Sequence, residues 1–371
     1  MLSHKLLLAR PYRPCPRSLP AKEIASTLKR FLLTVSISLI LSIIFLACQV
    51  DSKETSIPLG SLWYPVYGYD RDTGECQGGL GSAAWNDGGA PVLVTPVSGF
   101  YCFGDPAYQE TTIQLMTEYG LTWTLVSYNG WGDVALDGNI EAEDFEAAHR
   151  DIGKLFERSA GRLKIALLVE PYVDLGGLDP ATLTDPQKAE IRDRIWTEIY
   201  QPNRDSVMEW EGKPLLVQWF PMDLGQDDRF TIKTFGSLPD PAAPVLDWNW
   251  YPALDKYPQI ISNDGFLSFA PRFDEYFMWL NRLLPNPRRM DPFLEEGIYC
   301  KFWNIAAENK DQVKLILIYA WNAYGEQAFI EPATNGPLGS GGEDGRQLLE
   351  RTRSYYRQFL EGRGISCLPA P

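Results

Sequence analysis

The sequence predicts an α/β protein built on a single (β/α)8 barrel of the TIM type, preceded by an N-terminal signal or anchor segment. Short apolar runs that suit strands buried on both faces alternate with helical segments six to eight times along the chain. Polar and aromatic residues repeatedly follow the strand ends, as they do at the C-terminal rim of such a barrel. The 371 residues are enough for one large barrel. A doubly wound sheet is the alternative, although no glycine-rich nucleotide-binding motif follows any strand.

The first 48 residues differ from the rest of the chain and predict export. Residues 31–47 form an uncharged apolar run that follows Lys29 and Arg30 and ends at Cys48. A basic stem, an apolar stretch and a cysteine resemble a bacterial lipoprotein signal, which predicts lipid on Cys48 and a location in the cell envelope. The run is also long enough for a retained transmembrane anchor, so both forms stay open. The expected domains are a signal peptide or anchor at 1–48, a tether at 49–56, the barrel at 57–362 and a tail at 363–371.

Charge and histidine content limit the chemistry. Residues 1–48 carry seven Lys or Arg and one Glu, which leaves 27 basic and 47 acidic residues in the remainder, a net charge of −20. This charge argues against nucleic acid or an anionic membrane surface as a partner of the folded part. His149 is the only histidine in the remainder, which argues against Ser-His-Asp, His-rich zinc and Cys-His sites. We expect His149 to be structural, and the protein to be a monomer without cofactor or metal.

The individual helices and strands are predicted from the spacing of apolar residues along the chain and from helix-capping residues. Asp105 and Pro106 supply an N-cap and a first-turn proline to a helix that ends at Gly120, and Gly161 ends a second helix over 140–160. Further helices are predicted at 185–200, 275–284, 292–308 and 346–360. Strands are predicted at 61–69, 121–127, 163–169, 215–219, 266–270 and 315–319, and residues 230–235 and 245–250 each suit a fifth strand.

Aromatic and carboxylate side chains gather after the predicted strand ends. The 12 tryptophans, all beyond residue 60, suit either a large core or platforms for sugar rings and other flat ligands. Aromatic faces stack on the C–H surfaces of sugars, while carboxylates and amides bind the hydroxyls. Cleavage of a glycosidic bond needs one carboxyl group as acid and a second group as base or nucleophile. The strand-end residues are Trp63, Trp131, Trp219, Trp248, Trp250, Trp321, Asp133, Glu170, Asp223, Asp247, Asp274 and Glu326. A strand end with solvated carboxylates is the alternative for each.

The segment from 320 to 332 carries a family resemblance. Its residues WNAYGEQAFIEP resemble the signature W/F-N-E-x-x-E-x-x-x-I-E of endo-α-mannosidase-like glycoside hydrolases (families 99 and 71) and of related bacterial cell-surface polysaccharide proteins. The aromatic segment 63–69, the strand end 169–172 and residues 212–214 fit the same pattern. The resemblance covers residues 57–332. It implies a (β/α)8 barrel, no metal, and action on α-linked mannose-type or similar polysaccharide.

One departure from the signature bears directly on catalysis. The family's base, a Glu directly after the Asn, is replaced by Ala323, whereas the later acid is present as Glu326. Alanine cannot accept a proton, so either another carboxylate at the rim supplies the base, with Glu170 the best candidate, or the protein binds glycan without cleaving it. We therefore predict Glu326 and Glu170 as catalytic. The predicted substrate-binding residues are Trp63, Tyr64, Tyr67, Asn129, Trp131, Tyr172, Trp219, Trp250, Arg272, Trp321, Asn322, Tyr324 and Glu331.

The cysteines are consistent with an oxidising compartment. Four lie beyond Cys48, namely Cys76, Cys102, Cys300 and Cys367. Four cysteines in an exported protein predict two disulfides with three possible connectivities, and we expect Cys76–Cys102 to be one of them. Metal ligation is the weaker alternative, because no pair has CxxC spacing.

Overall fold

The structure is a computed structural model. It describes residues 56–65, 95–98, 101–128, 142–170, 183–237, 246–250, 261–271, 273–274, 289–290, 298–323, 328–334 and 346–367. The chain divides between Ser56 and Ile57 into two units, and every described helix and strand belongs to the second.

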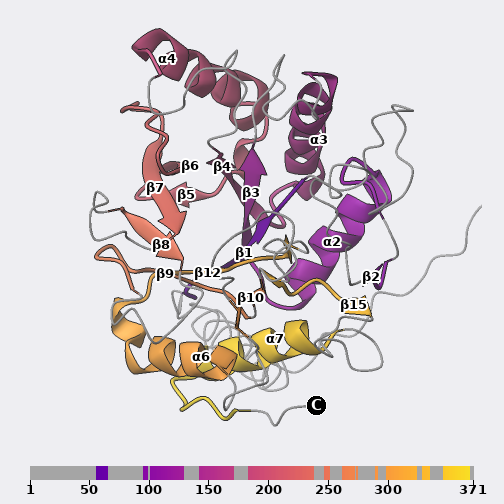
Figure 1. Cartoon of the computed structure of the whole chain (residues 1–371), viewed down its shortest axis with the longest axis vertical. Coiled ribbons are helices and arrows are strands. Elements are labelled where there is room, and N and C mark those ends of the chain that lie inside the picture. Colours follow the sequence, from indigo (N-terminus) through magenta and orange to yellow (C-terminus); the bar gives the residue numbers. More distant parts are fainter. Residues whose placement is uncertain are drawn as a thin grey trace, which may run out of the picture. The chain divides into compact units, whose positions relative to one another are not determined.

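The centre of this unit is a parallel sheet (Figure 1). Across the described residues its parallel strands are β1 (Leu59–Trp63), β3 (Trp123–Tyr128), β4 (Lys164–Val169), β6 (Lys213–Trp219), β7 (Thr231–Ser237), β8 (Trp248–Trp250), β9 (Phe266–Phe269) and β12 (Leu315–Ile318). Hydrogen-bonded neighbours follow the order β8-β7-β6-β4-β3-β1-β12-β9, and β5 (Glu209–Trp210) pairs antiparallel with β6. Apart from β8 and β9, which are the two ends of this order, parallel strands that follow one another in the chain are neighbours in the sheet. This is the arrangement expected of successive β-α units.

The sheet curls until the strands at the two ends of this order come close together. Trp248 of β8 and Phe266 of β9 stack with ring centroids 4.1 Å apart. Inside the curl, large side chains fill the space that small ones leave. A Cβ at Gly60 would lie 2.4 Å from the Trp123 indole, and that indole donates a hydrogen bond to the Ile316 carbonyl at 3.2 Å. Gly60 is therefore required by the close approach of this ring.

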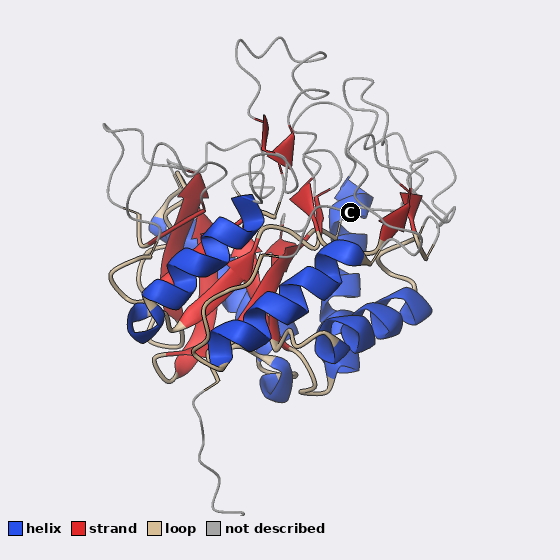
Figure 2. Ribbon diagram, turned by 90° about the horizontal axis from the view of Figure 1, so that it is seen from below, coloured by secondary structure: helices blue, strands red, loops and turns tan. Residues whose placement is uncertain are grey.

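Helices lie along the outer side of the sheet (Figures 1 and 2). In chain order they are α2 (Pro106–Glu118), α3 (Ala142–Ser159), α4 (Asp185–Arg194), α6 (Ile298–Glu308) and α7 (Gln347–Leu360). The π-helix η3 (Ile195–Tyr200) continues α4, and η4 (Arg204–Ser206) and η6 (Lys310–Gln312) are 3-10 turns. Asp105 caps α2 by accepting a hydrogen bond from the Ala107 N–H at 2.8 Å. Gly120 (φ +90°) follows this helix in the left-handed conformation that the sequence predicts.

Three short antiparallel ladders lie at one end of the large sheet (Figure 2). They pair β2 (Thr95–Pro96) with β15 (Ala333–Thr334), β10 (Phe273–Asp274) with β11 (Arg289–Met290), and β13 (Asn322–Ala323) with β14 (Ala328–Phe329). The β13–β14 ladder holds part of the segment that carries the family resemblance.

Most predicted elements are found, with small changes of boundary. Segments 230–235 and 245–250 contribute one strand each, β7 and β8, so neither excludes the other. The first strand ends at Trp63, and the remainder of the predicted strand 61–69 includes residues outside those described. The predicted helix 275–284 also lies outside them.

One disulfide joins Cys300 on α6 to Cys367. Cys102 is also disulfide-bonded, while Cys76, its predicted partner, lies outside the described residues. Within the described part of the chain, no helix has the length and apolar character needed to cross a membrane. The apolar run 31–47 and Cys48 are not among those residues, and their role stays a prediction.

Candidate functional site

The candidate site is formed by polar groups at the carboxyl ends of the parallel strands. The Trp123 indole lies inside the curl, and side chains alternate between the two faces of a strand, so Leu125 faces inward as well. Ser127, two residues after Leu125, therefore lies on the inner face of the curled sheet. A buried rim with polar groups from several strand ends is where β/α proteins hold their reactive residues.

Glu170 is a buried carboxylate at this rim. It directly follows β4 and is only 7% exposed. The Ser127 hydroxyl, at the end of neighbouring β3, donates to Glu170 Oε1 at 3.1 Å. The Glu170 N–H donates to the Tyr128 carbonyl at 3.0 Å. The side chain and the backbone of Glu170 are thus both held by the end of β3.

Asn322 connects the chain after β12 to the end of β1. Its Oδ1 accepts from the Tyr64 N–H at 2.8 Å, and its Nδ2 donates to the Tyr64 carbonyl at 2.9 Å. Nδ2 also lies 3.2 Å from the Tyr101 hydroxyl. Asn322 is fully buried, so its amide has a structural function, since it bonds backbone groups that lie beyond the β1–β12 ladder.

Glu331 accepts hydrogen bonds from two tyrosines, one of which, Tyr101, also contacts Asn322. Tyr101 donates to its Oε2 at 2.7 Å and Tyr108 to its Oε1 at 3.1 Å. The two rings stack with centroids 3.6 Å apart. Burial, with the nearby Glu331 charge as the second cause, raises the pKa of Tyr108 well above its usual range. Tyr108 therefore stays a protonated donor to this carboxylate at ordinary pH.

Tyr101 and Tyr108 were missed by sequence analysis. Their contacts with Glu331 span 230 and 223 residues of chain, and no local motif marks either tyrosine. Tyr108 lies on α2, where only helical period could be read from the sequence.

Tyr64 and Tyr319 form a second polar pair at the rim. Their hydroxyls lie 2.8 Å apart and their rings meet edge to face. Tyr319 is buried, whereas Tyr64 is partly exposed. Tyr64 thus offers a hydroxyl and part of a ring to any ligand at the ends of β1 and β12.

The predicted tryptophan platforms differ in exposure. Trp63 is fully buried against Phe103, with centroids 5.3 Å apart, and Trp321 is fully buried as well. A platform for a sugar needs an exposed ring face, so we do not include these two rings in the proposed site. Trp219, at the end of β6, is partly exposed and packs edge to face on Phe235. Trp250 ends β8.

Other strand-end residues have structural roles. Trp248 is buried in the core. Asp223 forms an ion pair with Lys188 at 2.9 Å, and Asp247 Oδ2 accepts from the Thr234 N–H at 2.9 Å. Asp274 lies in β10. The predicted site residues Tyr67, Asn129, Trp131, Tyr172, Arg272, Tyr324 and Glu326, together with Asp133, lie outside the described residues.

Ala323 is described and buried. It is 3% exposed and pairs with Ala328 in the β13–β14 ladder. A methyl group therefore lies at the position where the family signature has a base. In the described part of the chain, no group of three or more His, Cys, Asp and Glu residues could hold a metal ion.

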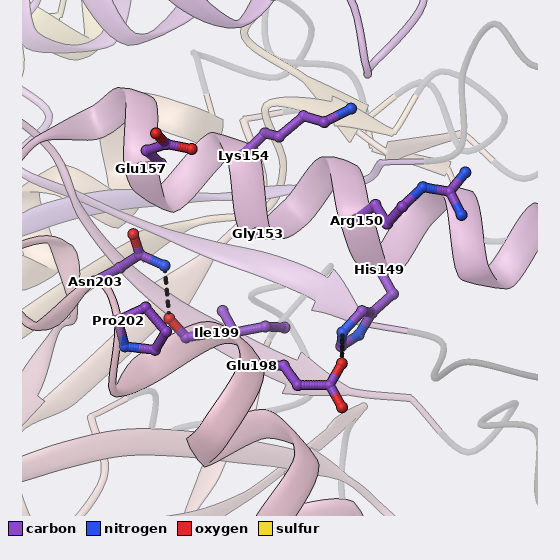
Figure 3. Close-up of a pocket in the computed structure, with 9 residues that line it drawn as sticks. All are labelled: His149, Arg150, Gly153, Lys154, Glu157, Glu198, Ile199, Pro202 and Asn203. Carbon is purple, nitrogen blue, oxygen red and sulfur yellow. Dashed lines mark hydrogen bonds and ion pairs between the residues drawn. The ribbon is translucent and has the colours of Figure 1, made fainter.

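A groove of about 570 Å³ lies on the outer side of the sheet, between α3 and η3 (Figure 3). His149 of α3 lines it with Glu198 of η3, and His149 Nε2 lies 2.9 Å from Glu198 Oε2. His149 Nδ1 lies 2.8 Å from the Tyr128 hydroxyl. This histidine therefore joins strand, helix and π-helix, in keeping with the expected structural role.

The fold and the position of these groups define a class: a curled, mainly parallel α/β protein with buried carboxylates at the carboxyl ends of its strands.

No protein-family profile and no curated protein matches the sequence. Among solved structures the fold is similar to that of the GH99 endo-α-mannosidase from Bacteroides thetaiotaomicron. In its complex with bis-tris propane, that enzyme has 17% sequence identity to this chain. The two structures match with a TM-score of 0.55 over 82% of this chain and 98% of that chain. A second structure of that enzyme is 16% identical, with a TM-score of 0.54 and the same coverage. The resemblance predicted from residues 57–332 is thus confirmed at the level of the fold.

Proposed function

We propose that this protein is a glycoside hydrolase acting on polysaccharide or oligosaccharide. The observation that carries the proposal is the position of Glu170, a buried carboxylate at a strand end that Ser127 holds by a hydrogen bond. Acid–base cleavage of a glycosidic bond needs carboxyl groups fixed in this way. The substrate class, α-mannose-type linkages included, is proposed from the sequence resemblance and from the endo-α-mannosidase to which the fold is similar.

In this proposal the curled sheet closes into a full (β/α)8 barrel. The Trp248–Phe266 stack, which brings the end strands β8 and β9 together, supports closure. Glu326 acts as general acid and Glu170 as base or nucleophile. Tyr64 and Trp219, which are partly exposed, contact the sugar. The protein is exported and attached to the membrane by its N-terminal segment.

A second candidate function is glycan binding without cleavage on the same fold. Ala323 favours it, because a buried methyl group stands at the position of the family's base. Glu170 would then accept hydrogen bonds from sugar hydroxyls.

The two functions are separated by measuring product release and binding on the same protein. The purified full chain in detergent is screened on α-mannans and other polysaccharides, with product analysis and calorimetry. For a hydrolase we expect products, and Glu170→Gln and Glu326→Gln lower kcat by about 10²-fold or more while binding is kept. Glu157→Gln, an exposed carboxylate on α3, serves as the matched control with unchanged kcat. Binding without products from any polysaccharide would establish the second function.

A further inference from the structure

The end of β3 is held from both faces of the sheet by consecutive residues. Ser127 faces inward and donates to Glu170 Oε1 at 3.1 Å. Tyr128 faces outward, and its hydroxyl lies 2.8 Å from His149 Nδ1. The Tyr128 carbonyl in turn accepts the Glu170 N–H at 3.0 Å. A shift of Tyr128 therefore displaces its own carbonyl and the adjoining Ser127, each of which bonds to Glu170.

We propose that His149 is a positioning residue for Glu170. It anchors Tyr128 against the helix layer, and Tyr128 with Ser127 fixes the backbone and the carboxylate of Glu170. The catalytic consequence rests on the proposed function, whereas the anchoring itself does not. Displacement of a reacting group by about 1 Å can lower a rate about 10²-fold. A contact that keeps Glu170 in place can therefore affect the rate even though His149 does not touch the substrate.

The partners of His149 determine its orientation. A carboxylate only accepts hydrogen bonds, so Nε2 carries the proton that is donated to Glu198 Oε2 at 2.9 Å. In the neutral ring this leaves Nδ1 as the acceptor of the Tyr128 hydroxyl. Glu198 is itself fixed, because Arg194 Nε donates to its Oε1 at 2.8 Å. A ring bonded through both nitrogens and only 6% exposed has one orientation, which makes it a rigid anchor.

The groove beside His149 allows this chain of contacts to be tested without overpacking. His149 lies at its edge, facing Glu198 (Figure 3). Asparagine and glutamine are both smaller than histidine, so they replace the ring at position 149 without steric conflict.

The test uses two substitutions that each keep one half of the anchor. The amide of His149→Asn takes the place of Nδ1 and retains the contact with Tyr128. The amide of His149→Gln takes the place of Nε2 and retains the contact with Glu198. Tyr128→Phe removes the hydroxyl alone. Arg150 lines the same groove, and Arg150→Gln is the matched control.

Hydrogen exchange of the Glu170 amide in the full chain tests the anchoring without any substrate. We expect the Glu170 amide to exchange about fivefold faster in His149→Gln and Tyr128→Phe, because each variant loses one hydrogen bond and this is the typical effect of such a loss. His149→Asn and Arg150→Gln should stay within about twofold of the wild type. The double variant Tyr128→Phe/His149→Gln should exchange no faster than either single variant, because both remove the same contact. Equal exchange in the Asn and Gln variants would overturn the proposal.

Kinetics on a cleaved polysaccharide test the consequence. We expect kcat about tenfold lower in His149→Gln and Tyr128→Phe with KM within about twofold, and kcat restored by His149→Asn. Altered exchange with unchanged kcat would overturn the positioning role while leaving the hydrolase function intact. If the wild type cleaves nothing, the proposed function fails, and the exchange measurement alone supports or refutes the anchor.

Discussion

The side-chain amide of Asn322 pairs with the backbone of Tyr64 as a strand would, through hydrogen bonds of 2.8 and 2.9 Å. It thereby extends the contact between β1 and β12 beyond the last residues of their ladder. The same amide lies against Tyr101, whose hydroxyl is bonded to Glu331. The rim at this point is thus held by side chains from three distant parts of the sequence.

Removal of this amide should destabilise the protein markedly. Asn322→Ala removes the two hydrogen bonds that this amide makes with the backbone of Tyr64 in a partly buried region, and the loss of such a partner costs about 1–3 kcal/mol for each group. We expect a loss of about 3 kcal/mol in the free energy of unfolding, measured by urea denaturation. Asn304→Ala, a half-buried amide on α6, should cost about 1 kcal/mol or less. Equal losses at both positions would contradict the role given to Asn322.

The Cys300–Cys367 disulfide should contribute strongly to stability. It closes a loop with a sequence separation of 67, for which chain entropy predicts about 4 kcal/mol. We expect Cys367→Ser to lower the unfolding free energy by this order, and reductant should lower that of the wild type as well. Thiol titration of the denatured, unreduced mature protein should find almost no free thiol. Four free thiols would refute both disulfides.

Acid should weaken the contact between α4 and the loop after β6 through Asp227. Hydrogen bonds from Arg229 hold the pKa of this carboxyl well below its usual range, and Arg192 Nε, 3.1 Å from Oδ2, adds to the effect. Because the folded pKa is lowered, the stabilisation is present above the unfolded value of about 3.9 and is lost as pH falls below it.

The measurement for Asp227 is urea unfolding between pH 7 and pH 2.5. The stability difference between wild type and Asp227→Asn should be largest near pH 7 and shrink below about pH 4. Asp228→Asn, at the exposed neighbouring carboxyl, should show no such trend. A difference that stays constant with pH would mean that the ion pair is not its source.

Membrane attachment is a prediction of the N-terminal sequence. The apolar run 31–47 and Cys48 predict that the full-length protein partitions with membranes and incorporates labelled lipid. We expect Cys48→Ala to abolish the labelling, with Cys102→Ala as the control that retains it. Membrane partition without labelling in the wild type would favour a retained anchor.

The order and type of the main elements were determined by the sequence alone. Apolar runs such as 163–169 and 315–319, the Asp105 cap and the glycines at 120 and 161 act on their immediate neighbours. Local patterns of this kind indicate the type and order of strands and helices without reference to any tertiary contact. The position of Glu170 just after a buried strand was predictable for the same reason.

The tertiary structure decided which residues meet at the rim and which are buried. Tyr64 and Asn322 are 258 residues apart, and Tyr101 and Glu331 are 230 apart. No local period encodes such pairs, because they depend on which strands become neighbours when the sheet curls. Trp63 and Trp321 follow the same rule: their place near strand ends was visible in the sequence, but only packing against other elements shows that they are buried. His149 likewise shows helical spacing in the sequence, and its link to Tyr128 exists only because α3 packs over the end of β3.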